Sequence, residues 1–438
     1  MLRFFYLQEA RTAGQPNRGE CFITKNKKKI GYLEYNSFLC SKLVYLLSMK
    51  RIAFLLCVIS IALSCYAQNQ TLDDYVSSVK EKSCAPIDYI FNLFENSDIV
   101  VIGERDHRDT TQYELILDLL KDPRFAQEVG YVYTEVGCVN RTKDVNKLLC
   151  GRYKSDKAFN DALYTYLRNE DFNPLWDKYN RVQFLRGLYE INRNSKHKIT
   201  LGLTDCNFSW KRIKTAEEYK NFDDSPACAY RDSTMCLHFS KMYAKQKLKN
   251  GKRKALVITN HPHALNATFE GSDYHRQGKW LKERYGNDNV KIVMLNWTEY
   301  TNSNDQQTSL VADGLWDAAF EVVDCHPFGM DIKGTPFGHT PYFNDRYGKM
   351  KWEDVVDGVI YYRPCYETVL TIGIPGIVSA DFEEEFMRRI KIYFEAMELS
   401  VPTLEEAKPA YDRFVSFPGT YPQSPDSVRE SIRKLLAE

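Results

Sequence analysis

Six short apolar runs, each followed at once by a polar residue, constrain the fold more than any other feature of the sequence. The runs are rich in β-branched residues and do not alternate with polar ones. Such runs are typical of strands that are buried on both faces, as in a sheet covered by helices. The predicted strands are Ser97–Gly103, Val129–Thr134, Ile199–Thr204, Ala255–Thr259, Val290–Leu295 and Gly358–Tyr362.

Helical patterns separate these runs. Apolar residues recur at spacings of three and four in Thr111–Leu120, Lys143–Leu149, Lys157–Leu167, Arg181–Asn192, Asp381–Met397 and Ser427–Leu436. Strands that alternate with helices predict an α/β fold, a three-layer α/β/α sandwich with a mostly parallel central sheet. We expect one such domain over residues 68–400, with a helical insertion at about 140–250 beside the sheet. A C-terminal loop and helix are expected over 401–438.

The N-terminal residues have the pattern of a secretory signal peptide. From Met49, two cations precede the 13-residue apolar run Ile52–Ser64, and Cys65-Tyr66-Ala67 follows with small residues at the cleavage positions. The run is shorter than the roughly 20 residues that span a bilayer. We therefore expect residues 49–67 to be a signal peptide and 1–48 to be a non-native upstream extension. The mature protein would be exported, to the periplasm or the cell envelope.

A lipid anchor is an alternative end to this segment, because Ala62-Leu63-Ser64-Cys65 resembles a lipobox. Lipidation at Cys65 would be the protein's one connection to a membrane.

Residues 68–438 carry 49 Lys and Arg against 55 Asp and Glu, a net charge of −6. This balance does not favour nucleic acid as a partner.

Eight cysteines follow residue 67, and none of them forms a C-x-x-C motif. The sequence therefore gives no support for a zinc ribbon or a thioredoxin-type site. An even number of cysteines in an exported protein permits disulfides, and Cys228 and Cys236 are the closest pair in sequence. Scattered buried thiols explain the same cysteines equally well.

Candidate catalytic residues follow the predicted strands. In an open α/β sheet, ligands bind beyond the carboxyl ends of the strands. Glu104 and His107 follow the first strand, and their spacing of three places both side chains on one side of a turn. A carboxylate beside an imidazole raises the imidazole pKa and fixes its tautomer, which suits a base that activates water. The other residues expected at this edge are Glu135, Asp205, His261, His263 and Arg363.

Each of these residues also has a structural interpretation. Glu135 alone could cap the next helix. His261 and His263 flank Pro262 and would diverge on an extended segment unless the loop bends. They suit oxyanion stabilisation, metal ligation or haem contact, or they are loop histidines that bond a neighbouring strand end.

The motifs and their order resemble the erythromycin-esterase-like and ChaN-like superfamily over residues 95–365. The resemblance lies in G-E-x-x-H after the first strand, a Glu at the end of the second and a His-rich segment after the fourth. It continues in Leu175-Trp176, in the helix before Leu201–Asp205, and in Asp357–Tyr361. The resemblance implies that the active-centre residues are Glu104, His107, Glu135, His261 and His263.

The esterase branch implies metal-independent hydrolysis of an ester or related bond, with no cofactor and a small-molecule substrate. Asp205, Arg108 and Arg363 would then contact the substrate. Arg108 stands where the family commonly has glycine, and with Arg105 and Asp106 it is expected to narrow the pocket against macrolide-sized substrates. The ChaN-like branch implies a haem- or iron-binding envelope protein, and the Tiki-like branch a divalent-metal hydrolase. The sequence does not determine the oligomeric state.

Overall fold

A computed structural model describes residues 70–300, 308–342, 348–420 and 423–437. The expected upstream extension, the expected signal peptide and Cys65 lie outside these residues. Residues Thr71–Glu438 form one compact unit. None of the helices in the described ranges is long and apolar enough to cross a membrane.

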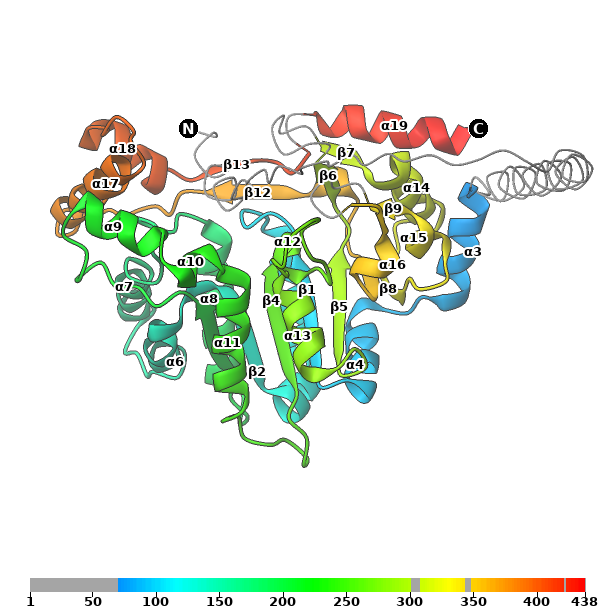
Figure 1. Ribbon diagram of the computed structural model, residues 1–438, viewed down its shortest axis with the longest axis horizontal. Helices are drawn as coiled ribbons and strands as arrows, with labels where there is room; N and C mark the ends of the chain where they lie inside the picture. The colour runs from blue at the N-terminus through cyan, green and yellow to red at the C-terminus, as the bar shows by residue number, and fades with distance from the viewer. Residues whose placement is uncertain (1–69, 301–307, 343–347, 421–422, 438) are drawn as a thin grey trace, which may run out of the picture. The chain divides into compact units, whose positions relative to one another are not determined.

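A seven-stranded sheet lies at the centre of this unit (Figure 1). Its strand order is β3-β2-β4-β1-β5-β11-β8; the first six strands are parallel, and β8 is antiparallel to β11. The carboxyl ends of the parallel strands therefore share one edge. The strands are β1 Ile99–Glu104, β2 Tyr131–Cys138, β3 Thr200–Asp205, β4 Ala255–Asn260, β5 Val290–Leu295, β8 Phe328–Asp331 and β11 Gly358–Tyr361.

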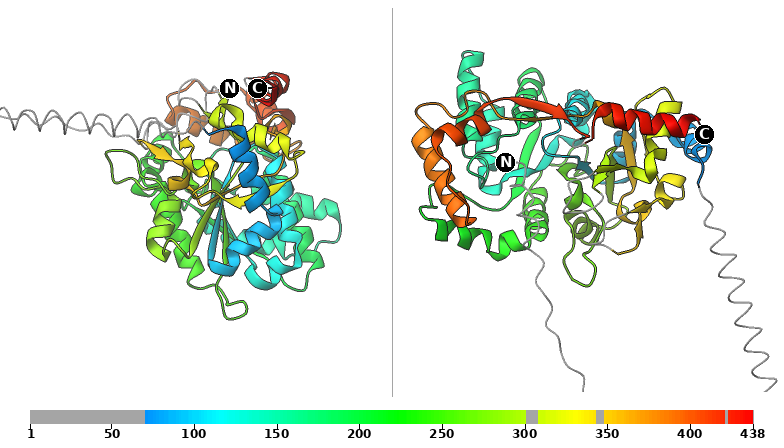
Figure 2. Two further views of the ribbon diagram at one scale, coloured as in Figure 1. Left: turned by 90° about the vertical axis from the view of Figure 1, so that its right-hand side faces the viewer. Right: turned by 90° about the horizontal axis from the view of Figure 1, so that it is seen from above.

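Alternate residues of the inner strands enter two hydrophobic clusters, one on each face of the sheet. In β1, for example, Val100 and Ile102 belong to the first cluster, and Ile99 and Val101 to the second. Helices α4, α5, α6, α7, α8 and α17 contribute to the first cluster, and α3, α11, α13 and α14 to the second. Figure 2 shows helices on both sides of the sheet. The predicted α/β fold with a mostly parallel central sheet is confirmed.

The six predicted helices correspond to α5, α6, α7, α8, α17 and α19, each within a few residues at both ends. Helices α6, α7 and α8, expected beside the sheet, pack on it in the first cluster. The helices are α3 Leu72–Lys82, α4 Pro86–Asn96, α5 Thr111–Lys121, α6 Thr142–Leu149, α7 Asp156–Leu167, α8 Tyr179–Asn194, α9 Ala216–Asp223, α10 Pro226–Ala229, α11 Arg231–Tyr243, α12 His261–Ala264, α13 Gln277–Tyr285, α14 Leu315–Val322, α15 Pro336–His339, α16 Trp352–Val355, α17 Glu383–Ala396, α18 Leu404–Asp412 and α19 Pro425–Ala437.

Strand β2 is longer than the sequence predicts. The predicted strand ends at Thr134, but the observed strand continues to Cys138, which still pairs with β3 after a register shift. Gly137 has a φ of +106° within this irregular stretch, a conformation that favours glycine. Glu135 therefore lies within a strand, in its irregular segment beyond the last pairing of β2 with β4.

The C-terminal region contains a two-stranded ribbon that the sequence did not predict. Strand β12, Val369–Ile372, pairs antiparallel with β13, Val415–Pro418. The ribbon crosses above the carboxyl edge of the sheet in Figure 1, and Leu370 forms a β-bridge with Asp109 in the segment after β1. Two further short ribbons pair β6 Thr298–Tyr300 with β7 Thr308–Leu310, and β9 Pro341–Tyr342 with β10 Met350–Lys351.

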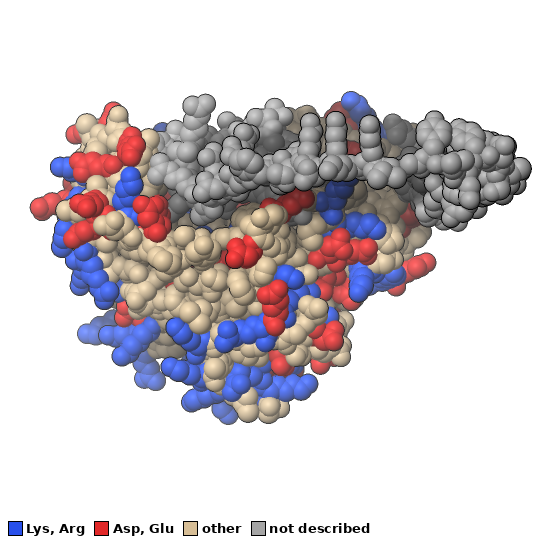
Figure 3. Space-filling model, viewed as in Figure 1, with Lys and Arg blue, Asp and Glu red and all other residues tan. Residues whose placement is uncertain are grey.

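Charged side chains are unevenly placed on the face drawn in Figure 3. Lys and Arg gather toward its lower end. Figure 1 places the connection between α11 and β4 there, at the end of the sheet away from the carboxyl edge. This connection carries six cations in the ten residues 245–254. The cluster described next lies at the opposite edge.

Candidate active site

The carboxyl edge of the sheet brings the predicted acidic residues and histidines together. Glu104 and Asp205 are the last residues of β1 and β3, and Glu135 lies in β2. His107 follows β1 in a turn, and Asn260 ends β4 directly before α12, which carries His261 and His263. Because these strands are parallel neighbours, their ends meet in space although the residues span 160 positions of the sequence.

His107 lies between two carboxylates. Its Nδ1 is 3.2 Å from Glu104 Oε2, and its Nε2 is 3.5 Å from Glu135 Oε1. The other oxygen of Glu104 accepts hydrogen bonds from Tyr113 Oη at 2.8 Å and Gln112 Nε2 at 3.2 Å. Burial lowers the pKa of His107, but the two carboxylates outweigh burial and raise this pKa to about 10. At neutral pH His107 is therefore a positively charged imidazolium, with a proton on both ring nitrogens.

Glu135 is the centre of the cluster and is only 1% exposed. Its Oε2 accepts hydrogen bonds from the Asn260 backbone N–H at 2.7 Å and from Thr259 Oγ1 at 3.0 Å. Its Oε1 faces His107 Nε2 and His263 Nε2, each at 3.5 Å, and Arg231 Nη2 at 3.0 Å. Burial disfavours the charged carboxylate, but the surrounding cations hold the pKa of Glu135 well below its usual value. Glu135 is therefore ionised.

Arg231, the first residue of α11, connects two strand ends. Its Nε and Nη2 donate to the carboxylate of Asp205 at 3.0 and 2.6 Å, a two-point contact, and Nη2 also reaches Glu135. Its Nη1 is 3.3 Å from His263 Nε2. Asp205 was predicted to contact substrate; in the structure it is fully buried and holds Arg231. This guanidinium bridges the two carboxylates and brings a permanent positive charge to the site.

His263 has a carboxylate partner of its own. Its Nδ1 is 2.8 Å from Oδ1 of Asp232, which is fully buried. Asp232 also accepts from the Gln277 backbone N–H at 2.8 Å and from Tyr274 Oη at 3.0 Å. Burial lowers the pKa of His263, but Asp232 and Glu135 outweigh it and raise that pKa. The pairing of His263 with Asp232 resembles that of His107 with Glu104.

His261 has a different environment, although it is two residues from His263. Its ring packs edge-on against Trp297, with centroids 4.7 Å apart, and its buried Nδ1 has no hydrogen-bond partner. Burial, together with the positive charge of Arg276, lowers the pKa of His261 to about 3. His261 is therefore a neutral imidazole. The short helix α12 bends the segment and separates the two rings.

The arginines near the site make other contacts than the sequence suggested. Arg108 forms a two-point ion pair with Asp106. Arg105 is 1% exposed and pairs with buried Asp109 at 2.6 Å, so its side chain lies in the interior. Arg363 pairs with Glu114 of α5 at 2.5 Å and is 40% exposed. Its backbone oxygen accepts from Asn296 Nδ2 at 2.7 Å.

Arg231 and Asp232 were missed by sequence reasoning. They begin a helix in a long helical stretch, where a charged pair is normally solvent-exposed. Helix α11 packs beside β3, and this tertiary contact carries its first turn to the strand ends. The one signal in the sequence is that both charged residues stand at the start of a helix. This signal does not point to a functional site unless the position of the helix in the fold is known.

The donor atoms fit a metal ion poorly. Among the described residues, no group of three or more His, Cys, Asp or Glu side chains is arranged to hold one. His107 Nε2, His263 Nε2 and Glu135 Oε1 converge, but the guanidinium of Arg231 lies 3.0 Å from that oxygen. A fixed positive charge at this position opposes a bound cation.

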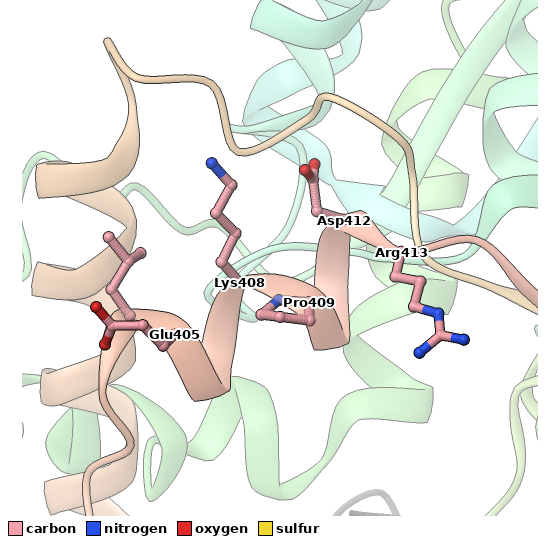
Figure 4. Close-up of a pocket in the computed structure, with 6 residues that line it drawn as sticks. Glu405, Lys408, Pro409, Asp412 and Arg413 are labelled. Carbon is pink, nitrogen blue, oxygen red and sulfur yellow. The ribbon is translucent and has the colours of Figure 1, made fainter.

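A separate hollow of about 370 Å³ lies along α18. Figure 4 shows the charged ends of Lys408, Asp412 and Arg413 pointing apart, so they do not converge on one ligand. The residues that line it are Leu404, Glu405, Lys408, Pro409, Asp412 and Arg413. None of them belongs to the cluster of carboxylates and histidines.

Comparison with solved structures finds chains of low similarity. A succinoglycan biosynthesis protein aligns at 12% identity and a TM-score of 0.46, over 67% of this chain and 97% of its own. A Bacillus cereus protein aligns at 12% identity and 0.41, over 66% and 97%. A variant of the erythromycin esterase EreC in its open conformation aligns at 10% identity and 0.42, over 62% and 92%. No family model matches the sequence, and no curated protein matches it significantly.

Proposed function

We propose that the chain is an exported hydrolase that activates water at a centre formed by Glu104, His107 and Glu135. The observation that carries the proposal is the placement of His107, with Nδ1 on the Glu104 carboxylate and Nε2 toward Glu135. A carboxylate on one ring nitrogen orients the imidazole and leaves the other nitrogen for proton transfer. The substrate bond is an ester or a related bond.

In the proposed reaction, the water oxygen bonds to the carbonyl carbon while its proton passes to neutral His107 Nε2. The oxyanion that forms is stabilised by the positive charges of Arg231 and His263, which lie beside Glu135. The bond to the leaving alkoxide then breaks, and His107 returns the proton to the leaving oxygen.

The raised pKa of His107 sets the pH at which this reaction runs. A base acts only in its unprotonated form, and the two carboxylates keep His107 protonated up to a pH of about 10. Hydrolysis is therefore expected to be faster at alkaline pH than at neutral pH.

We favour hydrolysis over the haem-binding alternative because of the surroundings of the histidines. Both ring nitrogens of His107 and of His263 face carboxylates. The Nδ1 of His261 is buried, and the His261 ring packs edge-on against Trp297. An axial haem ligand gives one ring nitrogen to iron and so loses the carboxylate on that nitrogen, whereas proton transfer to and from His107 Nε2 keeps both carboxylates in place.

A panel of esters tests the proposal. Replacement of His107 by Ala is expected to reduce turnover about 100- to 10,000-fold, the usual effect of losing a positioned base. His197→Ala, an exposed histidine before β3, is the matched control and is expected to keep full activity. Chelator is expected to have no effect. Full activity in the His107 variant, or loss with chelator and recovery with a divalent metal, would refute the proposal.

A further inference from the structure

Two free thiols meet at the edge of the candidate site. The Sγ atoms of Cys206 and Cys228 are 3.4 Å apart. Cys206 follows β3 and is 1% exposed, whereas Cys228 lies in the short helix α10 and is half-buried. Cys236, nearest to Cys228 in sequence, instead packs with Phe239 in the second hydrophobic cluster. The fold therefore selects a different partner for Cys228 from the one that sequence proximity suggests.

The two thiols lie in the segments that hold Arg231 in position. The backbone N–H of Cys206 donates to Asp205 Oδ1 at 2.7 Å, and the same oxygen accepts from Arg231 Nε at 3.0 Å. Cys228 is three residues before Arg231, with α10 leading directly into α11. A covalent link between the sulfur atoms would join the segment that carries the Asp205 carboxylate to the segment that carries the guanidinium.

We propose that Cys206 and Cys228 form a redox-active pair that closes to a disulfide. The sulfur atoms must approach from 3.4 Å to about 2.05 Å, the length of a disulfide bond. This inference does not depend on the proposed hydrolase activity, because it rests on the thiol geometry alone.

The oxidant is a small-molecule or protein disulfide, R–S–S–R. The thiolate of the more exposed Cys228 attacks one sulfur of the oxidant and forms a mixed disulfide, and the first R–S⁻ leaves. The Cys206 thiolate then attacks Cys228 Sγ and expels the second R–S⁻. Two protein thiols are oxidised, one disulfide is reduced to two thiols, and the two protons go to the departing thiolates.

A glutathione redox titration of the purified protein tests the pair. Samples are equilibrated at increasing ratios of oxidised to reduced glutathione, blocked with an alkylating agent and digested without reductant. Mass spectrometry is expected to find a Cys206–Cys228 cross-linked peptide, about 2 Da lighter than the two free peptides together. Oxidation is expected to raise Tm by about 4 °C, given the length of the closed loop, and dithiothreitol to reverse the rise.

Three variants separate this pair from other thiols. Cys228→Ser and Cys206→Ser are expected to lose both the cross-link and the Tm rise, and Cys228 is the gentler site because it is half-buried. Cys150→Ser, an exposed cysteine, is the matched control and keeps both. The proposal is overturned if Cys206 stays reduced at the oxidising end of the titration, if Cys228 links to another cysteine, or if the Tm rise persists in Cys228→Ser.

Discussion

At the scale of single residues, the site consists of buried carboxylates that alternate with positively charged side chains. Glu104, Glu135 and Asp232 are each 1% exposed or less. A buried carboxylate is costly unless it is paired and hydrogen-bonded, and each of these has two or more partners. Loss of one partner therefore leaves an uncompensated charge in the interior.

Asp232 tests this argument. Replacement of Asp232 by Ala removes the carboxylate partner of His263 and leaves the Gln277 N–H unsatisfied. We expect the free energy of unfolding to fall by about 3–5 kcal/mol, as for other broken buried ion pairs. Urea unfolding followed by circular dichroism measures it. The control is Asp273→Ala, at an exposed position, whose free energy of unfolding is expected to stay within about 0.5 kcal/mol of the wild type. Equal losses in the two variants would contradict the argument.

The raised pKa of His107 also predicts a pH dependence of stability. The folded state binds the His107 proton more tightly than the unfolded chain does. The stabilisation is therefore complete below the unfolded pKa of about 6.5 and is lost as pH rises through the folded pKa of about 10. We expect His107→Gln to lose less stability than the wild type between these pH values. Unfolding free energies at a series of pH values measure the difference, and His197→Gln is the control, expected to follow the wild-type curve. If the curves of the wild type and of His107→Gln are parallel over this pH range, the pKa of His107 is not raised.

At the scale of helices and strands, the position of α12 depends on close packing against α13. A Cβ at Gly278 of α13 would lie 1.8 Å from the backbone oxygen of Ala264, the last residue of α12. Because α12 carries His261 and His263, this contact determines where both imidazoles lie. The close approach requires glycine at position 278.

Replacement of Gly278 by Ala is therefore expected to push α12 and α13 apart. We expect a loss of about 1–3 kcal/mol in unfolding free energy, the usual effect of overpacking. The matched control is Gly187→Ala, whose Cβ would meet only the movable end of the Leu117 side chain. Urea denaturation compares the two variants. If both lose the same stability, the backbone contact does not constrain α12.

The elements that sequence predicted and those it missed differ in how they are stabilised. The parallel strands were predictable because burial on both faces requires an uninterrupted apolar run, as in Val100 and Val101 of β1. Strand β8, Phe328–Asp331, has four residues and includes a glycine, and strand β13 is largely exposed. Both depend on pairing with a strand elsewhere in the chain, so neither has a local signal.

The residues of the site also fall into those that the sequence predicts and those that it misses. Residues at strand ends follow from topology, so the neighbourhood of Glu104, His107 and Glu135 could be predicted once the strands were placed. Arg231 and Asp232 reach the site through the packing of α11 on β3, which no local pattern encodes. The charge state of His107 depends on a distance to Glu135, a residue 28 positions away, and follows only from coordinates.

At the scale of the whole molecule, we expect the mature protein to start at or near Gln68. The pattern of cations, apolar run and small residues is complete from Met49 onward. Intact mass and N-terminal sequencing of the secreted or envelope fraction measure the start. A lipid-modified Cys65 would support the anchored alternative, whereas residues 1–48 attached to the mature product would contradict the signal peptide.

The central claim is that the Glu104–His107–Glu135 centre activates water, and the pH dependence of kcat/KM for ester hydrolysis tests it most directly. The wild-type rate is expected to rise about tenfold per pH unit above neutrality and to level off near the His107 pKa of about 10. Glu104→Gln keeps a hydrogen-bonding side chain but removes the charge nearest to Nδ1. Its profile is expected to level off at a lower pH. An identical profile in the wild type and Glu104→Gln would show that His107 is not the base.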